Sequence, residues 1–279
     1  MGGVLGSIVI PAYNEGAVIS RCLDEVFDGL DPSEVEVVVA CNGCTDDTAA
    51  QVRSSRYPVQ LLDLPEAGKI GALNAGEEAV TALPRLYLDA DVTINGHTVR
   101  HVLEATSERA LAARPRITFD TSRSSRLVRH YYAAREHLPG VMSELCTGGV
   151  YALSAAARSR FDRFPEVIAD DLFAARIIRD DEIEIVEGEP VVVHVPRTGR
   201  ALVAVLKRVY RGNRELADER PDLTSSTTTS TARELFALAR TRGHLVDAAV
   251  YAGFALGARV AVALDRNPAR WERDDTSRQ

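Results

Sequence analysis

The chain has 279 residues, 46% of them hydrophobic, which is enough apolar content for a sizeable core. Its formal net charge of −7 excludes the global basic field that draws proteins to nucleic acid, so we expect no nucleic-acid partner. No secretory signal is visible, because the first apolar run lacks a basic flank and meets Pro11, and we therefore expect a cytoplasmic protein.

The first 95 residues alternate short apolar runs with helical patterns. Asn14 and Thr45 stand where the caps of the first two helices are expected. This alternation predicts an α/β fold with a mostly parallel sheet and right-handed crossovers. The predicted strands are residues 7–10, 35–40, 59–64 and 86–88, and the predicted helices are residues 15–30, a short helix after 46, and 68–83.

The patterns weaken beyond Asp91 but continue to the C-terminus. A Ser/Thr-rich run at 222–231 has no apolar pattern and predicts a mobile connection. We expect a main domain at 1–216 (nucleotide-binding half 1–95, acceptor half 96–216), a flexible linker at 217–231, and a helical appendage with a polar tail at 232–279. Further helices are predicted at 97–112, 125–137, 154–161, 170–179, 201–216, 232–240 and 245–264, and extended segments at 116–120, 148–153 and 184–195, the last with a break at Pro190.

The helix predicted at 245–264 is unusually apolar. Asp247 and Arg259 leave a charge-free run far shorter than the roughly 20 residues that span a bilayer. We expect it to pack against the body of the protein or against a second copy, giving a homodimer through the C-terminal helices. Peripheral membrane contact is the alternative.

Two aspartates, Asp89 and Asp91, follow the fourth predicted strand. At the carboxyl end of a buried strand, where open α/β sheets bind ligands, two carboxylates can hold a hard divalent cation and leave room for a diphosphate. The alternative is a strand end with two solvated aspartates. Loops 11–15, 41–46 and 65–69 are expected at the same edge, which suits a nucleotide with a metal-bound diphosphate.

Competing sites are disfavoured by the loop sequences. The position for a dinucleotide-binding Gly-x-Gly-x-x-Gly holds residues 11–15, Pro-Ala-Tyr-Asn-Glu, and no P-loop motif occurs. Cys41 and Cys44 form a Cys-x-x-Cys that can be a redox pair or half a zinc site, but no second pair stands at zinc-ribbon spacing.

Four stretches in order then resemble one family. Residues 8–15, 41–48, 68–76 and 89–91 are similar to the signatures of inverting family 2 glycosyltransferases with the GT-A fold. The resemblance implies a Rossmann-like mostly parallel sheet flanked by helices, followed here by the small helical appendage. It also implies transfer of a sugar from a UDP- or GDP-type donor to a hydroxyl of a small-molecule, glycan or lipid-linked acceptor, with Mn²⁺ or Mg²⁺ as cofactor.

On the donor side the resemblance implies a role for each matching residue. Pro11, Tyr13 and Glu15 would line the base and ribose. Asn42 stands where the family usually has an aspartate that accepts from the base, which leaves uridine or guanosine open. Lys69 would reach the diphosphate, or is a surface lysine.

At the fourth signature the resemblance separates the two aspartates. Asp89 would lie toward the ribose or sugar, and Asp91 would bind the metal. Gly148 and Gly149 resemble a Gly-rich strand entry near the donor sugar.

In the acceptor half, residues 169–172 resemble an acidic element whose second acid is the general base. Asp171 is therefore the expected base and Asp170 the alternate; the pair can instead serve only the positive end of its helix. His194 stands near a third metal ligand of some related enzymes, or is simply hydrogen-bonded. Arg208 and Arg211 would meet diphosphate, or are solvated helix charges.

Two other functions fit parts of the same sequence. One is a non-catalytic relative that only binds a nucleotide sugar. The other is a nucleotidyltransferase that makes a nucleotide sugar and releases pyrophosphate, although the 11–15 loop and the 68–76 stretch speak against it.

Overall fold

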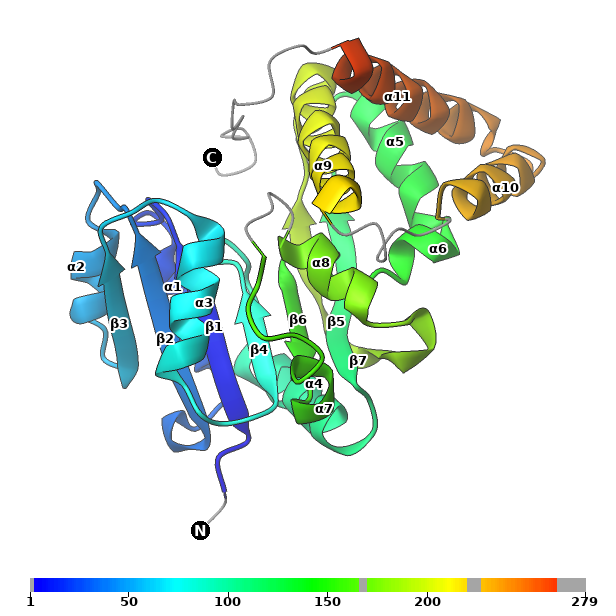
Figure 1. Ribbon diagram of the computed structural model, residues 1–279. Helices are drawn as coiled ribbons and strands as arrows, with labels where there is room; N and C mark the ends of the chain where they lie inside the picture. The colour runs from blue at the N-terminus through cyan, green and yellow to red at the C-terminus, as the bar shows by residue number, and fades with distance from the viewer. Residues whose placement is uncertain (1–2, 166–169, 220–226, 265–279) are drawn as a thin grey trace. The chain divides into compact units, whose positions relative to one another are not determined.

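The computed structural model describes residues 3–165, 170–219 and 227–264 of the chain (Figure 1). Its centre is a seven-stranded sheet in the order β3-β2-β1-β4-β6-β5-β7. The strands are β1 (Gly6–Ala12), β2 (Val35–Asn42), β3 (Val59–Leu64), β4 (Arg85–Leu88), β5 (Ala112–Asp120), β6 (Val150–Leu153) and β7 (Ile183–His194).

The first four strands are parallel, as the alternating pattern predicts. β1 pairs with β2 and with β4, β2 pairs with β3, and the strand order reverses between β1 and β4. β6 is antiparallel to β4 and β5, so the sheet as a whole is mixed. The reversal beside β1 creates a topological switch point, where open α/β sheets bind their ligands.

The chain divides into two compact units. Residues 1–118, 145–166 and 177–192 form the first, which we call the sheet unit. Residues 119–144, 167–176 and 193–279 form the second, the helical unit.

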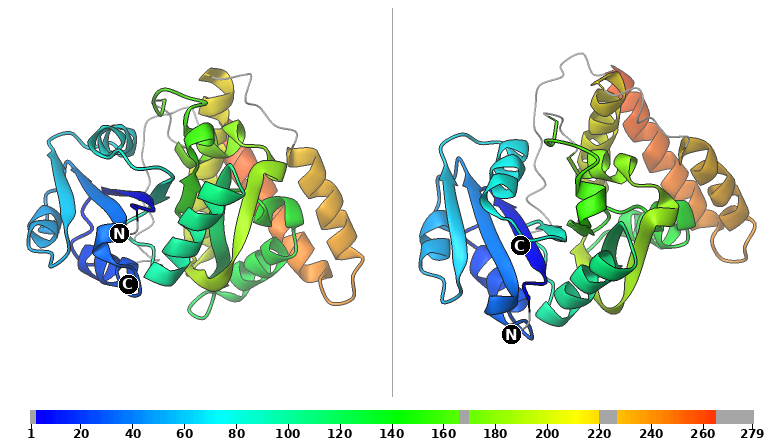
Figure 2. Two further views of the ribbon diagram at one scale, coloured as in Figure 1. Left: turned by 90° about the horizontal axis from the view of Figure 1, so that it is seen from below. Right: turned by 60° about the horizontal axis from the view of Figure 1, so that its bottom comes forward.

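In the sheet unit, helices cover both faces of a buried sheet. Every residue of β1 is buried, and Ile8, Val9 and Ile10 are fully inaccessible. α3 packs closely on β1 because Gly76 has no side chain there: a Cβ would lie 2.5 Å from the Val9 Cγ1. Figures 1 and 2 show α3 on the opposite face from α1. The helices of this unit are α1 (Ile19–Val26), α2 (Thr48–Arg53), α3 (Lys69–Ala79), α4 (Gly96–Glu108) and α7 (Ala155–Arg158), with single turns at Pro32–Glu34 and Asp180–Glu182.

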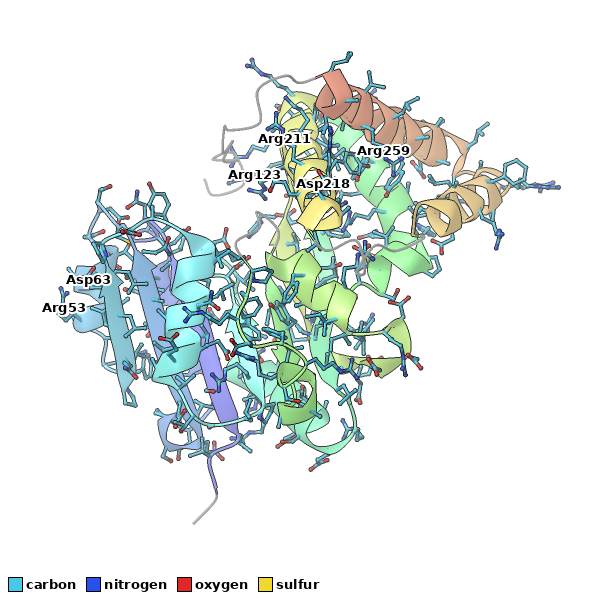
Figure 3. All side chains as sticks on the ribbon, in the orientation of Figure 1. Arg53, Asp63, Arg123, Arg211, Asp218 and Arg259 are labelled. Atoms are coloured by element: carbon cyan, nitrogen blue, oxygen red, sulfur yellow. The ribbon has the colours of Figure 1, made fainter. Side chains whose placement is uncertain are left out.

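Several predicted boundaries in this unit are wrong by a few residues. α1 begins at Ile19 rather than at 15, and its N-cap Val18 makes no side-chain bond. Thr45 does not cap α2, which begins at Thr48. β7 runs without a break through Pro190, since a proline is tolerated where no ladder donor is needed. At the outer edge, Arg53 of α2 pairs with Asp63 of β3 at 2.9 Å (Figure 3).

The helical unit is built around aromatic side chains. The Tyr131 ring stacks on the Tyr251 ring at a centroid distance of 4.7 Å, which joins α5 to α11. α11 also packs on α9 and α10. The helices of this unit are α5 (Arg126–Glu136), α6 (Pro139–Met142), α8 (Asp170–Ile177), α9 (Gly199–Glu219), α10 (Thr227–Ala239) and α11 (Leu245–Leu264).

The predicted division at the C-terminus needs correction. α9 extends to Glu219 and α10 begins at Thr227, so both ends of the expected linker 217–231 are helical; residues 220–226 lie outside the described part. Leu238 and Tyr251 share a buried cluster with Val128 and Leu202, because the apolar faces of α10 and α11 complete the core begun by α5 and α9. The expected appendage is therefore part of a larger unit, and its polar tail at 265–279 lies outside the described residues.

Among the described residues, α11 is the one helix long and apolar enough to cross a membrane by length and composition. Such a helix is weak evidence of a membrane span, because buried core helices of soluble proteins have the same length and composition.

Candidate functional site

The loops predicted to form the site meet at the carboxyl edge of the parallel strands. The strand register pairs Pro11 with Ala40 and Val9 with Tyr87, so β1, β2 and β4 end at the same side of the sheet. The loops after β1 and β4 flank the switch point. Tyr13 and Glu15 follow β1, while Asp89 and Asp91 follow β4.

The loop after β1 is held by the loop after β2. Asn14 has a positive φ of 53°, and its side-chain oxygen accepts a hydrogen bond from the Thr45 N–H at 2.8 Å. The Glu15 N–H donates to the Thr48 hydroxyl at 2.8 Å, and the Gly16 N–H donates to Asp46 at 3.0 Å. These bonds replace the predicted helix cap at Asn14 and fix the shape of the loop before any ligand arrives.

The Asp46 carboxylate links the loop after β1 to the loop after β2 by hydrogen bonds. Burial acts to raise its pKa, but hydrogen bonds from the side chain and backbone of Thr48 and from the Gly16 N–H outweigh that effect, so the pKa of Asp46 is lowered. The carboxylate is thereby kept ionised and bonded. No sequence pattern singled it out beyond its place in the 41–48 stretch.

Asn42 is buried and its amide bonds to the backbone. Its NH2 donates to the Ala12 carbonyl at 2.8 Å, and its oxygen accepts from the Gly68 N–H at 3.0 Å. With only 3% of its surface exposed, Asn42 ties the ends of β1 and β2 to the start of α3. Its predicted contact with the donor base stays a prediction.

Lys69 and Asp89 form an ion pair across the switch point. The Lys69 Nζ lies 2.9 Å from the Asp89 Oδ1, and both side chains are between a third and two fifths exposed. Lys69 opens α3, and the N-terminus of a helix carries partial positive charge. The pair places a cation and a carboxylate at the accessible edge of the sheet.

Gly149 sits directly against Asp89. The Asp89 N–H donates to the Gly149 carbonyl at 2.8 Å, and a Cβ on Gly149 would lie 2.9 Å from the Asp89 Oδ2. Gly148 and Gly149 both have positive φ, 102° and 71°. Glycine is therefore required here by backbone conformation and by the close approach of Asp89.

The buried thiol of Cys22 lies on α1, in the sheet unit. Burial raises the pKa of Cys22 to about 12, and Asp91, Asp89 and Glu15 act in the same direction. Cys41 and Cys44 are free thiols; burial, with Cys44 beside it, raises the pKa of Cys41 to about 12, which fits a packed thiol better than a reactive one.

The residues present suit a hard cation that is shared with a substrate. Nowhere in the described residues do three or more His, Cys, Asp or Glu side chains form a group that could hold a metal ion. Mg²⁺, however, is usually bound through one or two carboxylates together with substrate phosphates rather than by an all-protein cage. Asp91 offers one carboxylate of this kind at the sheet edge, and Asp89, two residues before it, is paired with Lys69.

The remaining predicted residues lie in the helical unit. His194, the last residue of β7, lies with its Nδ1 3.3 Å from the Asp120 carboxylate. Asp170 and Asp171 open α8, and their side chains lie outside the described part. Arg208 and Arg211 lie on α9, where Figure 3 labels Arg211. Their roles, and those of the donor-side residues, stay predictions.

Asn74 is a structural residue whose role the sequence alone did not reveal. It belongs to the 68–76 stretch, is 7% exposed, and exchanges two hydrogen bonds with the backbone of Phe164, at 2.9 and 3.1 Å. One turn later, Glu77 bonds to Tyr87 at 2.8 Å and to Arg158 at 2.5 Å. α3 thus carries Lys69 at its start and anchors the segment that follows α7.

The sequence matches one family over more than half of its length. The family model of Glycosyl transferase family 2 matches residues 7–162. An uncharacterized glycosyltransferase of a Nostoc species is 30% identical over 103 residues. That match spans 35% of this chain and 31% of the relative, so the chain covers about a third of the relative's length.

Solved structures share the fold at low identity. A mannosyltransferase from Pyrobaculum calidifontis, solved with GDP-Man and Mn²⁺, is 20% identical with a TM-score of 0.66, covering 96% of this chain and 89% of that one. Residues 1–349 of TarS from S. aureus are 16% identical to this chain with a TM-score of 0.56, and the match covers 92% of this chain and 80% of that one. Glucosyl-3-phosphoglycerate synthase of Mycobacterium tuberculosis was solved with Mn²⁺, UDP and glucosyl-3-phosphoglycerate. It is 22% identical with a TM-score of 0.51, and the match covers 73% of this chain and 77% of that one. The predicted GT-A fold is confirmed.

Proposed function

Because the chain belongs to glycosyltransferase family 2, we propose that it moves a sugar from a nucleoside-diphosphate donor to an acceptor hydroxyl, with inversion at the anomeric carbon. The observation that carries this proposal is the constellation at the switch point. Asp89, Asp91 and Lys69 stand at the sheet edge beside loops that are already braced.

In this proposal the donor diphosphate lies near Lys69. Its ammonium group and the N-terminus of α3 both favour negative charge. Tyr13, Glu15 and Pro11 line the nucleoside, on the loop held by Asn14 and Asp46. The donor base, uracil or guanine, is left open, since the Asn42 amide is bonded to backbone.

A divalent cation, Mn²⁺ or Mg²⁺, fits the Asp91 carboxylate with diphosphate oxygens completing the coordination, and it would offset the charge that develops on the leaving nucleotide. Asp89 orients the ribose or sugar and is held by Gly149. His194 is the proposed third ligand. Asp120 would fix the orientation of its ring, as carboxylates commonly do for metal-binding histidines.

Asp171, with Asp170 as the alternate, is the proposed base. It takes the proton from the acceptor hydroxyl as that oxygen attacks the anomeric carbon from the face opposite the diphosphate. The acceptor is a small molecule, a glycan or a lipid-linked sugar, and the proposed location is the cytoplasm. A homodimer through the C-terminal helices stays a prediction from the sequence.

Product analysis separates the candidate functions. Purified protein is incubated with UDP- and GDP-sugars and Mn²⁺, together with either a panel of acceptors, water or pyrophosphate, and the released nucleotide is identified. Glycosyl transfer releases a nucleoside diphosphate, whereas a nucleotidyltransferase consumes pyrophosphate in the reverse reaction and yields a nucleoside triphosphate.

Replacing Asp171 by Asn tests the base. Turnover is expected to fall by at least about a hundredfold, with donor affinity kept. Asp181→Asn, at an exposed aspartate paired with Arg179, is the matched control and should leave turnover unchanged. No turnover in wild type, with the donor still bound, would favour the non-catalytic relative, whereas equal turnover in wild type and Asp171→Asn would favour another base.

A further inference from the structure

α11 presents a long apolar face that other parts of the described chain leave open. Leu245, Leu256 and Leu264 are 64%, 63% and 75% exposed. Their spacing, with Val260 between the last two, puts them on one side of a helix. Exposed Ala249 lies on the same side, so the face runs for about 30 Å along the helix.

The two charges on α11 leave this face uninterrupted. Asp247 is buried, and its carboxylate accepts from the rings of His130 and His244 at 2.6 and 3.0 Å. Arg259 lies over the Tyr210 ring of α9 at 4.9 Å, on the side of α11 that Figure 3 shows toward α9. In the sequence these charges argue against membrane contact; in the fold Asp247 is buried, and the exposed Arg259 turns its guanidinium onto the Tyr210 ring beside the apolar face.

The exposed charged residues in the described part of α10 and α11, and in the turn that joins them, are basic. Between residues 231 and 264 the exposed charged side chains are Arg233, Arg240, Arg242 and Arg259. The acids of this stretch are Glu234, which accepts from the Gly140 N–H, and the buried Asp247. This local excess of positive charge stands out in a chain whose formal net charge is −7.

We propose that α10 and α11 form a docking surface for an anionic lipid bilayer, with α11 lying in the plane of the headgroups. An exposed apolar helix face in a segment whose exposed charges are arginines is typical of interfacial helices, in which apolar burial and attraction to anionic lipids add. Only 28% of the apolar stretch of α11 is buried, so most of this helix lies outside the core that its inner face completes, and a helix after residue 244 is not near the N-terminus, where a signal sequence lies. Its inner face packs on α5 and α9, which argues against a span.

A second copy of the chain is the competing occupant of this face. An isologous interface places the same patch on both sides, so it would bring the arginines of two copies into one contact region. The described part of the patch offers no exposed acid to pair with them. Anionic headgroups supply the missing charge, and they are therefore the better partner.

Vesicle sedimentation with the full chain tests the proposal independently of enzymatic activity. The protein is mixed with vesicles of phosphatidylcholine alone or of phosphatidylcholine with about a third phosphatidylglycerol. It should sediment with the anionic vesicles, and less so in high salt. The double substitution Arg240→Glu with Arg242→Glu should weaken binding by about fivefold or more for each arginine.

Leu256→Glu tests the apolar face and should weaken vesicle binding at least about tenfold. The matched control is Val192→Glu, at a 45% exposed apolar residue of the sheet unit, which should bind like wild type. Circular dichroism spectra and light scattering establish that each variant is folded and give its oligomeric state. Wild type that stays in the supernatant with anionic vesicles, or a dimer that Leu256→Glu dissociates without vesicle binding by wild type, would overturn the proposal.

Discussion

Replacing Asn74 by Ala should destabilise the sheet unit strongly although it touches no predicted ligand. Asn74 is 7% exposed and satisfies both the N–H and the C=O of Phe164. Its removal leaves two buried backbone groups without those partners, at about 1–3 kcal/mol each. Because some relaxation is expected, we predict a loss of about 2–4 kcal/mol in the free energy of unfolding. At roughly 2–4 °C per kcal/mol, the melting temperature should fall by about 4–16 °C.

Urea denaturation followed by circular dichroism measures this loss. The control is Asn95→Ala, which removes the N-cap of α4 and a bond to the exposed Glu189, and should cost only about 1 kcal/mol. Nucleotide affinity of the folded Asn74→Ala variant should stay close to wild type. A loss no greater than that of Asn95→Ala would refute the assignment of Asn74 as a buried clamp.

Three further outcomes are expected. Gly149→Ala should lower the free energy of unfolding by about 1–3 kcal/mol, since φ is +71° and the new Cβ meets Asp89; it should also weaken donor binding in calorimetric titration. The hydrogen bond from Arg160 lowers the pKa of Glu182 from 4.5 to about 2. The ionised Glu182 therefore contributes its full stabilisation of the folded state above about pH 4.5, and this contribution is lost as the pH falls toward 2. Glu182→Gln should therefore flatten the acid limb of a stability–pH curve between those values, and an unchanged limb would contradict this. Lys69→Met should raise the KM for the donor about tenfold to a hundredfold, and an unchanged KM would remove Lys69 from the diphosphate site.

The parallel part of the sheet, and the four stretches that follow its strands in order, were predictable because they rest on local sequence patterns. Apolar runs that end at Pro11, at Cys41 and at Asp89 are recorded in the sequence itself, and the parallel pairing follows from the helices between them. The loops of the donor side were placed correctly for the same reason. Their position at the strand ends follows from topology.

Long-range contacts and loop details were not predictable. Asn14 was expected to cap a helix, but its amide bonds to Thr45 thirty-one residues away, which no local pattern encodes. The His194–Asp120 pair likewise joins two strands through tertiary structure. In the sequence, Asp247 interrupts the apolar run of α11. The sequence does not show that His130 and His244 bond to its carboxylate in the fold.

The central claim is that the switch point binds a nucleotide sugar through Asp91 and a divalent cation. A thermal-shift panel of UDP, GDP, TDP and their sugars, with and without Mn²⁺, tests it directly on wild type and Asp91→Asn. At a hundred times Kd, a bound donor should stabilise wild type by about 2.7 kcal/mol, and the part that requires Mn²⁺ should disappear in Asp91→Asn. No shift with any nucleotide, or an equal Mn²⁺-dependent shift in both proteins, would contradict the account.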